Sequence, residues 1–253
     1  MSDRELAERV AIVTGSARNI GRSIALELAH AGASIVVNAK TSRAEADAVA
    51  REIEAAGGKA VVKLADVADP AGAKALVDAA VAAFGQLDIV VNNASVRREN
   101  ALGDISYGEW REVLGIILDA AFLVVQAAMP HLVSSGNGAV INLGGLSAHI
   151  GSARRAHVVA AKAGLVGLTR ALAHDLSPKG VTVNCVAPGT IDTVRAASST
   201  SGGEPAHHAH NKPLVGRRGA PEEIASLIRY LAGPNARYIT GQTIHANGGT
   251  FLP

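Results

Sequence analysis

The stretch Val10-Ala11-Ile12-Val13-Thr14-Gly15-Ser16-Ala17-Arg18-Asn19-Ile20-Gly21 decides the fold of this 253-residue chain. Apolar residues typical of a buried strand run through a glycine-containing turn into a segment with helical spacing. Such a strand–turn–helix directs backbone N–H groups and the positive end of a helix toward an anion such as a pyrophosphate. We therefore expect a dinucleotide to bind at Gly15, Ser16, Arg18, Asn19, Ile20 and Gly21.

The same pattern recurs along the chain. Short apolar runs alternate with segments of helical spacing, which predicts a parallel sheet with crossover helices. Within each run consecutive residues are apolar, as expected where helices cover both faces of a sheet. The predicted fold class is α/β, a single-domain Rossmann fold over residues 1–253 with a doubly wound parallel sheet of about seven strands. The expected strands are RVAIVTG, ASIVVNA, KAVVKLA, LDIVVNN, GAVINLG, VTVNCVAPG and QTIHANGG, and the expected helices are 20–31, 43–56, 71–84, 107–129, 155–176 and 221–231.

The composition favours a chain that acts on a small-molecule substrate. Its 24 basic and 22 acidic residues are spread along the sequence, so no basic tract indicates nucleic acid or a membrane surface as a partner. The polar start lacks a secretory signal, and Cys185 is the sole cysteine, which together favour a cytoplasmic location. The apolar stretch 114–132 contains Asp119 and Gln126, so we expect a buried or subunit-facing helix that ends around Pro130, not a membrane span.

One segment, 194–213, departs from the alternating pattern. It is rich in Ser, Gly, Ala and His and has no periodic apolar face, which predicts a mobile substrate loop. His207, His208 and His210 lie in it without a rigid scaffold or a neighbouring Cys or acidic cluster. We therefore expect a solvated loop and no metal site.

Further motifs follow the glycine-containing turn in order. Asp66-Val67 follows the third expected strand, and Asn92-Asn93-Ala94 follows the fourth. Lys162 lies in an expected helix, and Pro188-Gly189-Thr190-Ile191-Asp192-Thr193 follows the sixth strand. Together these motifs resemble the short-chain dehydrogenase/reductase family over residues 10–251, most closely its 3-oxoacyl-carrier-protein reductase branch.

The resemblance implies a role for each motif and a homo-oligomer, specifically a tetramer. Asn19 replaces the family's second glycine and Ser95 the glycine after Asn-Asn-Ala, but Asn tolerates left-handed backbone angles, so cofactor binding should survive. The implied contacts are Asp66 and Val67 with the adenine, Asn92 and Ala94 with the cofactor, Lys162 with the ribose hydroxyls, and the loop of Pro188, Gly189, Ile191 and Thr193 with the nicotinamide end, where Ile191 and Thr193 meet the carboxamide.

The end of the second expected strand predicts which dinucleotide binds. An acid there would bind a ribose 2′-hydroxyl and repel a 2′-phosphate, but residues 37–43 contain no acid. Asn38 and Lys40 lie at this end, and Arg18, Lys40 and Arg43 are placed to meet a phosphate. We therefore expect NADP(H) in preference to NAD(H). The alternative is that these cations are ordinary solvated side chains.

Three catalytic positions of the family are substituted. The family's Tyr, four residues before the Lys, falls at Val158, its Ser, thirteen residues before that Tyr, at Gly145, and its helix Asn at Ile117. A valine cannot donate a proton, and the loss of a general acid costs about 10²- to 10⁴-fold in rate. The enoyl-reductase spacing, with a Tyr seven residues before the Lys, is not met either, since Arg155 stands there. Ordinary carbonyl reduction should be very slow.

Two histidines near Lys162 are candidates for a replacement proton donor. His149 and His157 lie between the fifth expected strand and the Lys162 helix, and the pKa of a histidine suits proton transfer near neutrality. His157 is one residue from the Tyr position, so it faces a different direction on the helix. A surface or interface side chain is therefore the alternative for His157.

Three hypotheses remain. The first is an NADP(H)-dependent oxidoreductase with a non-standard proton donor, whose substrate pocket comprises residues 95–102, 145–155 and 194–213. The second is a non-catalytic binder that senses its ligand or serves as an inactive partner subunit. The third is cofactor-independent lyase or isomerase chemistry by the His and Arg side chains near Lys162.

Overall fold

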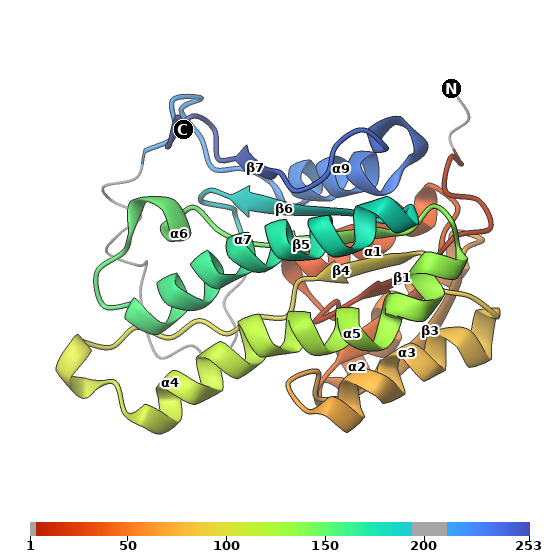
Figure 1. Ribbon diagram of the computed structural model, residues 1–253, viewed down its shortest axis with the longest axis horizontal. Helices are drawn as coiled ribbons and strands as arrows, with labels where there is room; N and C mark the ends of the chain where they lie inside the picture. The colour runs from red at the N-terminus through yellow and green to blue at the C-terminus, as the bar shows by residue number, and fades with distance from the viewer. Residues whose placement is uncertain (1–3, 194–211) are drawn as a thin grey trace.

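Seven parallel strands form one sheet within residues 4–193 and 212–253, the residues that the computed structural model describes (Figure 1). Their order, β3-β2-β1-β4-β5-β6-β7, reverses direction between β1 and β4. In open α/β sheets such a reversal leaves a crevice at the carboxyl ends of the strands, where ligands bind. The strands are β1 Val10–Val13, β2 Ser34–Ala39, β3 Lys59–Leu64, β4 Ile89–Asn92, β5 Ala139–Leu143, β6 Thr182–Pro188 and β7 Thr243–Ala246.

Helices cover both faces of the sheet. On one face pack α1 (Asn19–His30), α2 (Arg43–Ala55) and α9 (Pro221–Ala232), and on the other α3 (Pro70–Phe84), α5 (Ala120–Ser134) and α7 (Ala156–Leu176). Neighbouring strand residues point into different layers, since Val13 packs with the first group and Ile12 with the second. The predicted doubly wound fold is confirmed. Short helical segments occur at Leu102–Asp104, Ser147–Ile150 (α6), Ser177–Lys179 and Pro234–Ala236.

The helix expected over 107–129 is longer and composite. It consists of α4 (Tyr107–Leu114), a π-helical turn at Gly115–Asp119, and α5, which continues past Pro130 to Ser134. The expectation that the helix ends around Pro130 is therefore wrong. A proline removes one backbone hydrogen bond, but the buried side chains on either side of it, Ala128 and Leu132, hold the last turn on the sheet.

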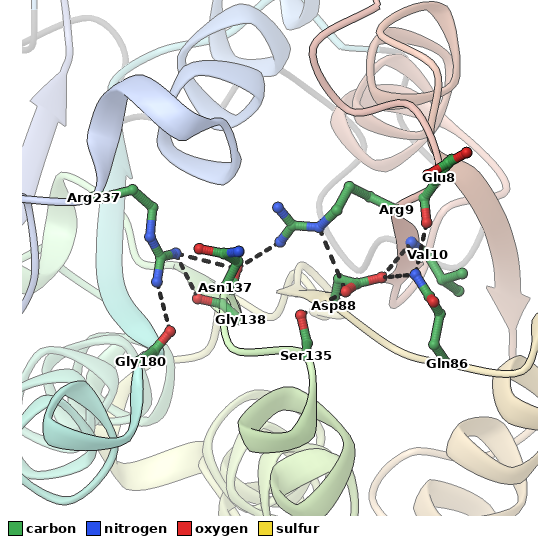
Figure 2. A network of polar contacts seen from close by, with 10 residues as sticks. All are labelled: Glu8, Arg9, Val10, Gln86, Asp88, Ser135, Asn137, Gly138, Gly180 and Arg237. Atoms are coloured by element: carbon green, nitrogen blue, oxygen red, sulfur yellow. Dashed lines mark hydrogen bonds and ion pairs between the residues drawn. The ribbon is translucent and has the colours of Figure 1, made fainter.

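At the amino ends of the strands a closed polar network joins distant loops (Figure 2). The buried carboxylate of Asp88 accepts hydrogen bonds from the Val10 backbone N–H and the Gln86 amide, both at 2.8 Å, and from the Ser135 hydroxyl at 2.6 Å. The Arg9 guanidinium lies 3.5 Å from the same carboxylate and donates to the Asn137 carbonyl. These contacts tie β1, β4 and the end of α5 together and leave the opposite end of the sheet for a ligand.

Candidate cofactor and substrate site

A cavity of about 500 Å³ opens at the carboxyl ends of the strands. Its walls come from the turn after β1, the ends of β2 and β3, the segments after β4 and β5, one face of α7, and the loop after β6. We call the part around Gly15–Gly21, Asn38–Ser42 and Asp66 the cofactor half. The part around Ser95–Glu99, Gly145 and Arg155 is the substrate half, and Lys162 lines the same cavity.

The turn after β1 has the backbone shape that a bound pyrophosphate requires. Gly15 and Asn19 both adopt left-handed backbone angles, with φ of 62° and 51°. The sequence expectation that Asn19 can stand in for a glycine is thus confirmed. A Cβ atom on Gly21 would lie 2.4 Å from the Gly15 carbonyl oxygen, so no side chain fits where α1 begins. Gly21 therefore lets the first turn of α1 pack closely against the residues that follow β1.

Hydrogen bonds to the segment after β4 hold the turn after β1 in this conformation. The Thr14 hydroxyl oxygen accepts hydrogen bonds from the backbone N–H groups of Asn93 and Ala94, at 2.9 and 3.0 Å. The Asn93 amide in turn donates to the carbonyls of Thr14 and Gly15. Sequence analysis assigned Asn92 to the cofactor, but the Asn92 amide lies beneath the cavity and donates to Asn142 at 2.8 Å. Asn93 lines the cavity instead, because successive residues at the end of a strand point to opposite sides.

Two other predicted cofactor residues shape the site from below. The Ser16 side chain is fully buried, and its oxygen accepts from the Asn38 backbone N–H, so Ser16 is not among the lining residues. The Asn38 amide oxygen accepts from the Gly15 N–H at 3.1 Å, while its nitrogen donates to the Lys63 carbonyl. Asn38 therefore joins the turn to β2 and β3, and its buried amide carries no charge that would repel a phosphate.

The cations predicted to meet a phosphate separate into two groups. Arg18 and Lys40 line the cavity, whereas Arg43 pairs with Asp47 one turn along α2 and lies outside the lining. Lys40 lies 2.6 Å from Asp66, an ion pair that raises the pKa of Lys40 and lowers that of Asp66. Arg43 pairs with a carboxylate at the i+4 position of its own helix, and its contact with a phosphate remains a prediction.

Lys162 is the titratable group at the centre of the cavity. Its side chain extends from α7 and is buried, and its ammonium donates to the Leu143 carbonyl at 2.5 Å. Burial lowers the pKa of Lys162 from its ordinary value to about 8, since desolvation penalises the charged form. At neutral pH the group is therefore mostly protonated and yet close to giving up its proton.

The three positions that were predicted to be substituted lie in the cavity lining or beside it. Val158 and Gly145 line the cavity, and a Cβ atom on Gly145 would meet no atom within 4 Å. Ile117 lies in the π-helical turn and is buried with Val158 in one apolar cluster. The cavity wall at Val158 is therefore apolar, and open space remains beside Gly145. The cluster comprises Val113, Ile117, Ala121, Val158, Ala161 and Leu165.

Neither candidate histidine is among the residues that line the cavity. His157 is fully buried, not a surface side chain, because α4 covers it and Glu109 lies 3.0 Å from its Nε2. The Val158 N–H donates to His157 Nδ1, so the ring proton is on Nε2 and points toward Glu109. His149 packs its ring 4.4 Å from that of His245, and burial lowers the pKa of His149. The structure therefore does not bring these histidines to the site.

Arg155 lies within the predicted pocket segment 145–155, although no specific role was predicted for its side chain. It lines the cavity from the start of α7, and its Nε atom is inaccessible to solvent. Arg97, Arg98 and Glu99 line the facing wall, within the predicted pocket segment 95–102. The sequence feature that could have predicted a role for Arg155 is its spacing of seven residues from Lys162, which places both on the same side of the expected helix.

Most predicted site residues converge on this cavity. The predicted loop 194–213, with His207, His208 and His210, lies outside the described residues except for Lys212 and Pro213. Within 4–193 and 212–253 no group of three or more His, Cys, Asp or Glu side chains could hold a metal ion. The predicted residues that line the cavity are Gly15, Arg18, Asn19, Ile20, Gly21, Asn38, Lys40, Asp66, Val67, Ala94, Lys162, Pro188, Gly189, Ile191 and Thr193.

Comparison with known proteins places this geometry among nucleotide-dependent reductases. The family described as Enoyl-(Acyl carrier protein) reductase matches residues 15–250. The 3-oxoacyl-[acyl-carrier-protein] reductase FabG of Staphylococcus aureus is 40% identical over 242 residues, which are 96% of this chain and 98% of that protein. The Escherichia coli enzyme of the same name is 37% identical over 246 residues, with 96% and 98% of the two chains covered.

Solved structures agree over the whole chain. A dehydrogenase/reductase from Sinorhizobium meliloti superimposes with a TM-score of 0.91 at 35% identity, covering 99% of this chain and 98% of that one. A short chain dehydrogenase from Burkholderia cenocepacia in complex with NADP superimposes with a TM-score of 0.89 at 35% identity, covering 97% and 99%.

Proposed function

Because this chain belongs to the short-chain dehydrogenase/reductase family of oxidoreductases, we propose that it is an NADP(H)-dependent enzyme acting on a carbonyl or alcohol substrate, with Lys162 as its proton source. The observation that carries this proposal is the position of Lys162. Its buried ammonium lines a cavity whose other half has the shape and charge of a dinucleotide site. Bound NADPH supplies the hydride in such a reaction.

The cofactor half supports NADP(H) through two features. The turn with left-handed angles at Gly15 and Asn19 leads directly into α1, whose N-terminal end would hold a pyrophosphate. Arg18 and Lys40 line the outer end of the same half, where the 2′-phosphate of NADP(H) would lie. The relative from Burkholderia cenocepacia is in complex with NADP, which supports the same choice.

Lys162 is the proton donor best supported by the structure. The family's usual donor position holds Val158, and neither His149 nor His157 lines the cavity. With a pKa of about 8, the Lys162 ammonium is acidic enough to give a proton to a carbonyl oxygen and is regenerated near neutral pH. The reaction should be slow, because the open space beside Gly145 offers no hydroxyl to hold that oxygen.

One observation favours a non-catalytic binder instead. The apolar cluster that contains Ile117 and Val158 fills the place of a proton relay. In that case the chain would bind NADP(H) and a carbonyl-like ligand without turnover, as a sensor or as an inactive partner subunit. Cofactor-independent lyase or isomerase chemistry has weaker support, since it required histidines that do not line the cavity.

Two measurements test the proposal. Calorimetric titration should show tighter binding of NADPH than of NADH, and NADPH oxidation should be measured against 3-oxoacyl esters and diketones with the enzyme in excess. We expect slow oxidation that Lys162→Met abolishes. The absence of any NADPH binding would overturn the cofactor proposal. Intact binding with no oxidation across the panel would favour the non-catalytic binder.

We also propose that the protein is a homo-oligomer, specifically a tetramer. Two helical stretches, Tyr107–Ser134 and Ala156–Lys179, are apolar enough over a window of 18 residues to cross a membrane by length and composition, a test that core helices of soluble proteins also pass. Only 39% and 28% of those windows are buried within one chain. Phe122 and Met129 on α5 are exposed at 45% and 40%. A second copy would cover this surface.

Light scattering at micromolar concentration tests the oligomer. We expect a mass near four times 25.7 kDa. Phe122→Asp and Met129→Asp together should release smaller species, because charges would enter the contact. A wild-type monomer would contradict the proposal. The cytoplasmic location remains a prediction.

A further inference from the structure

The substrate half of the cavity carries an excess of positive charge. Arg97, Arg155 and Lys162 line it, and within the described residues Glu99 is the carboxylate on that wall. Arg98 also lines the cavity, and its guanidinium pairs with Glu112 at 3.0 Å. Asp66, the other acid of the lining, lies in the cofactor half against Lys40. Cations therefore outnumber carboxylates in the lining of the substrate half, whereas Lys40 and Asp66 form an ion pair in the cofactor half.

Three residues at the start of α7 and within it line the cavity. Arg155 immediately precedes the helix, and Val158 and Lys162, four residues apart, share one of its faces. The guanidinium of Arg155 thus approaches the cavity two turns before the ammonium of Lys162. Between them lies the short side chain of Val158, which leaves their shared space open to a ligand.

Burial is the main cause that lowers the pKa of both cations. At Arg155 the charge of Glu99 opposes this effect, and the charge of Arg97 adds to it more weakly. At Lys162, whose pKa is about 8, an interaction with Cys185 opposes the effect of burial, and the charge of Arg155 adds to it more weakly. Positive groups held together in a partly dry cavity are stabilised by an anion that enters it.

The facing wall is held firmly in place. Arg97 donates to the Thr193 hydroxyl at 2.8 Å, which joins this wall to the loop after β6. The Asn100 amide donates to both carboxylate oxygens of Glu109, which also lies against His157. His157 and Glu109 therefore hold Asn100, three residues after Arg97, while the Thr193 hydroxyl accepts from Arg97 itself.

We propose that Arg155, with Lys162 and Arg97, binds the carboxylate of an anionic small-molecule substrate. The inference rests on the proposed oxidoreductase function and names its substrate class. A planar guanidinium holds a carboxylate through two parallel hydrogen bonds and so fixes the orientation of the substrate. A neutral ester of the same acid would lose this contact while keeping its shape.

Binding to the intact protein with NADP⁺ tests the inference. Sodium 3-oxo carboxylates of about four to eight carbons are titrated by calorimetry beside their methyl esters, a range chosen to fit a pocket of this size. We expect at least one acid to bind at least about tenfold more tightly than its ester. Arg155→Gln should remove that preference and change the affinity of the ester less than about twofold.

The control is Arg111→Gln on α4, because Arg111 is exposed, pairs with Asp119 and lies outside the cavity lining. It should leave the preference for acids unchanged. NADPH affinity is measured on each variant, so that loss of cofactor binding counts against the proposed function and not against this inference. Equal affinity of acids and esters for a wild-type protein that binds NADPH would overturn the carboxylate site. Inorganic phosphate that competes as strongly as the acids would also overturn it.

Discussion

The two halves of the cavity differ in whether a glycine in each could be replaced by a residue with a side chain. In the cofactor half, a Cβ atom on Gly21 would lie 2.4 Å from a carbonyl oxygen, whereas in the substrate half a Cβ atom on Gly145 would meet nothing within 4 Å. In the first half Gly21 packs closely against the protein's own turn after β1. In the second half the space beside Gly145 is open. The contrast indicates that cofactor binding and catalytic chemistry are separable in this fold, because they depend on different side chains attached to the same strands.

The largest expected effect is on the reduction rate, when polar side chains are introduced at two positions of the substrate half. Val158→Tyr together with Gly145→Ser should raise the rate of NADPH-dependent reduction of a 3-oxoacyl ester by about 10²- to 10⁴-fold, since a phenol would stand one turn from Lys162. Either change alone should do little, because both groups hold the same substrate oxygen. Steady-state kinetics provide the measurement.

A matched control for this variant uses the same helix. Ala160 is exposed and lies outside the cavity lining, so Ala160→Tyr with Gly145→Ser should give no gain in rate. Equal gains from both double variants would show that the position of the phenol does not matter. Fast wild-type reduction would show that a proton donor has been missed.

The next largest effect is expected on NADPH affinity when a methyl group is added to a glycine in each half of the cavity. Gly21→Ala should weaken NADPH binding by about 10- to 100-fold, because overpacking at the pyrophosphate turn costs about 1–3 kcal/mol. Gly145→Ala should change the same dissociation constant less than about twofold, since the new Cβ atom has room. Calorimetry supplies the constants, and a thermal melt establishes that each variant is folded. Equal binding by both variants would refute the contrast.

A smaller effect concerns the outer end of the cofactor half. Arg18→Gln should lower the affinity for NADPH about tenfold and leave that for NADH nearly unchanged, since the lost contact is a charge-assisted hydrogen bond to a phosphate. Arg43→Gln is the control, because Arg43 pairs with Asp47 outside the lining. Fluorescence titration with both cofactors distinguishes the two arginines. An equal response to both substitutions would indicate a diffuse surface charge in place of a phosphate contact.

The smallest effect is a pH dependence centred on Lys162. The proton-donating form is lost as the pH rises through the pKa of about 8, so the single-turnover rate should fall about fourfold between about pH 7 and 8.5. Lys162→Arg keeps a cation but does not titrate in this range, so its slower reaction should be nearly independent of pH. A wild-type rate that is flat over this range would remove Lys162 as the proton source.

Local features of the sequence determined the fold and the cofactor half. Consecutive apolar residues in each strand require helices on both faces, and this requirement predicts the doubly wound sheet without knowledge of any contact. The turn from Gly15 to Gly21 is recognisable from residues adjacent in the chain, although Asn38 and Asn93 from other strands also hold its shape. The positions of Val158 and Gly145 relative to Lys162 were also available, because they are counted along one helix and its preceding strand.

Only the tertiary structure decided which polar side chains enter the cavity. His157 is one residue from a lining position, but Glu109, 48 residues away, lies against its ring outside the cavity lining. Arg155 and Arg97 come from segments that no local pattern brings together, and Asn92 is held beneath the site by Asn142 on the neighbouring strand. The sequence alone therefore identified the turn that would hold a dinucleotide, since its glycines and its strand–helix context are neighbours in the chain. The charges facing the substrate depend on packing between distant elements, and only the folded structure establishes them.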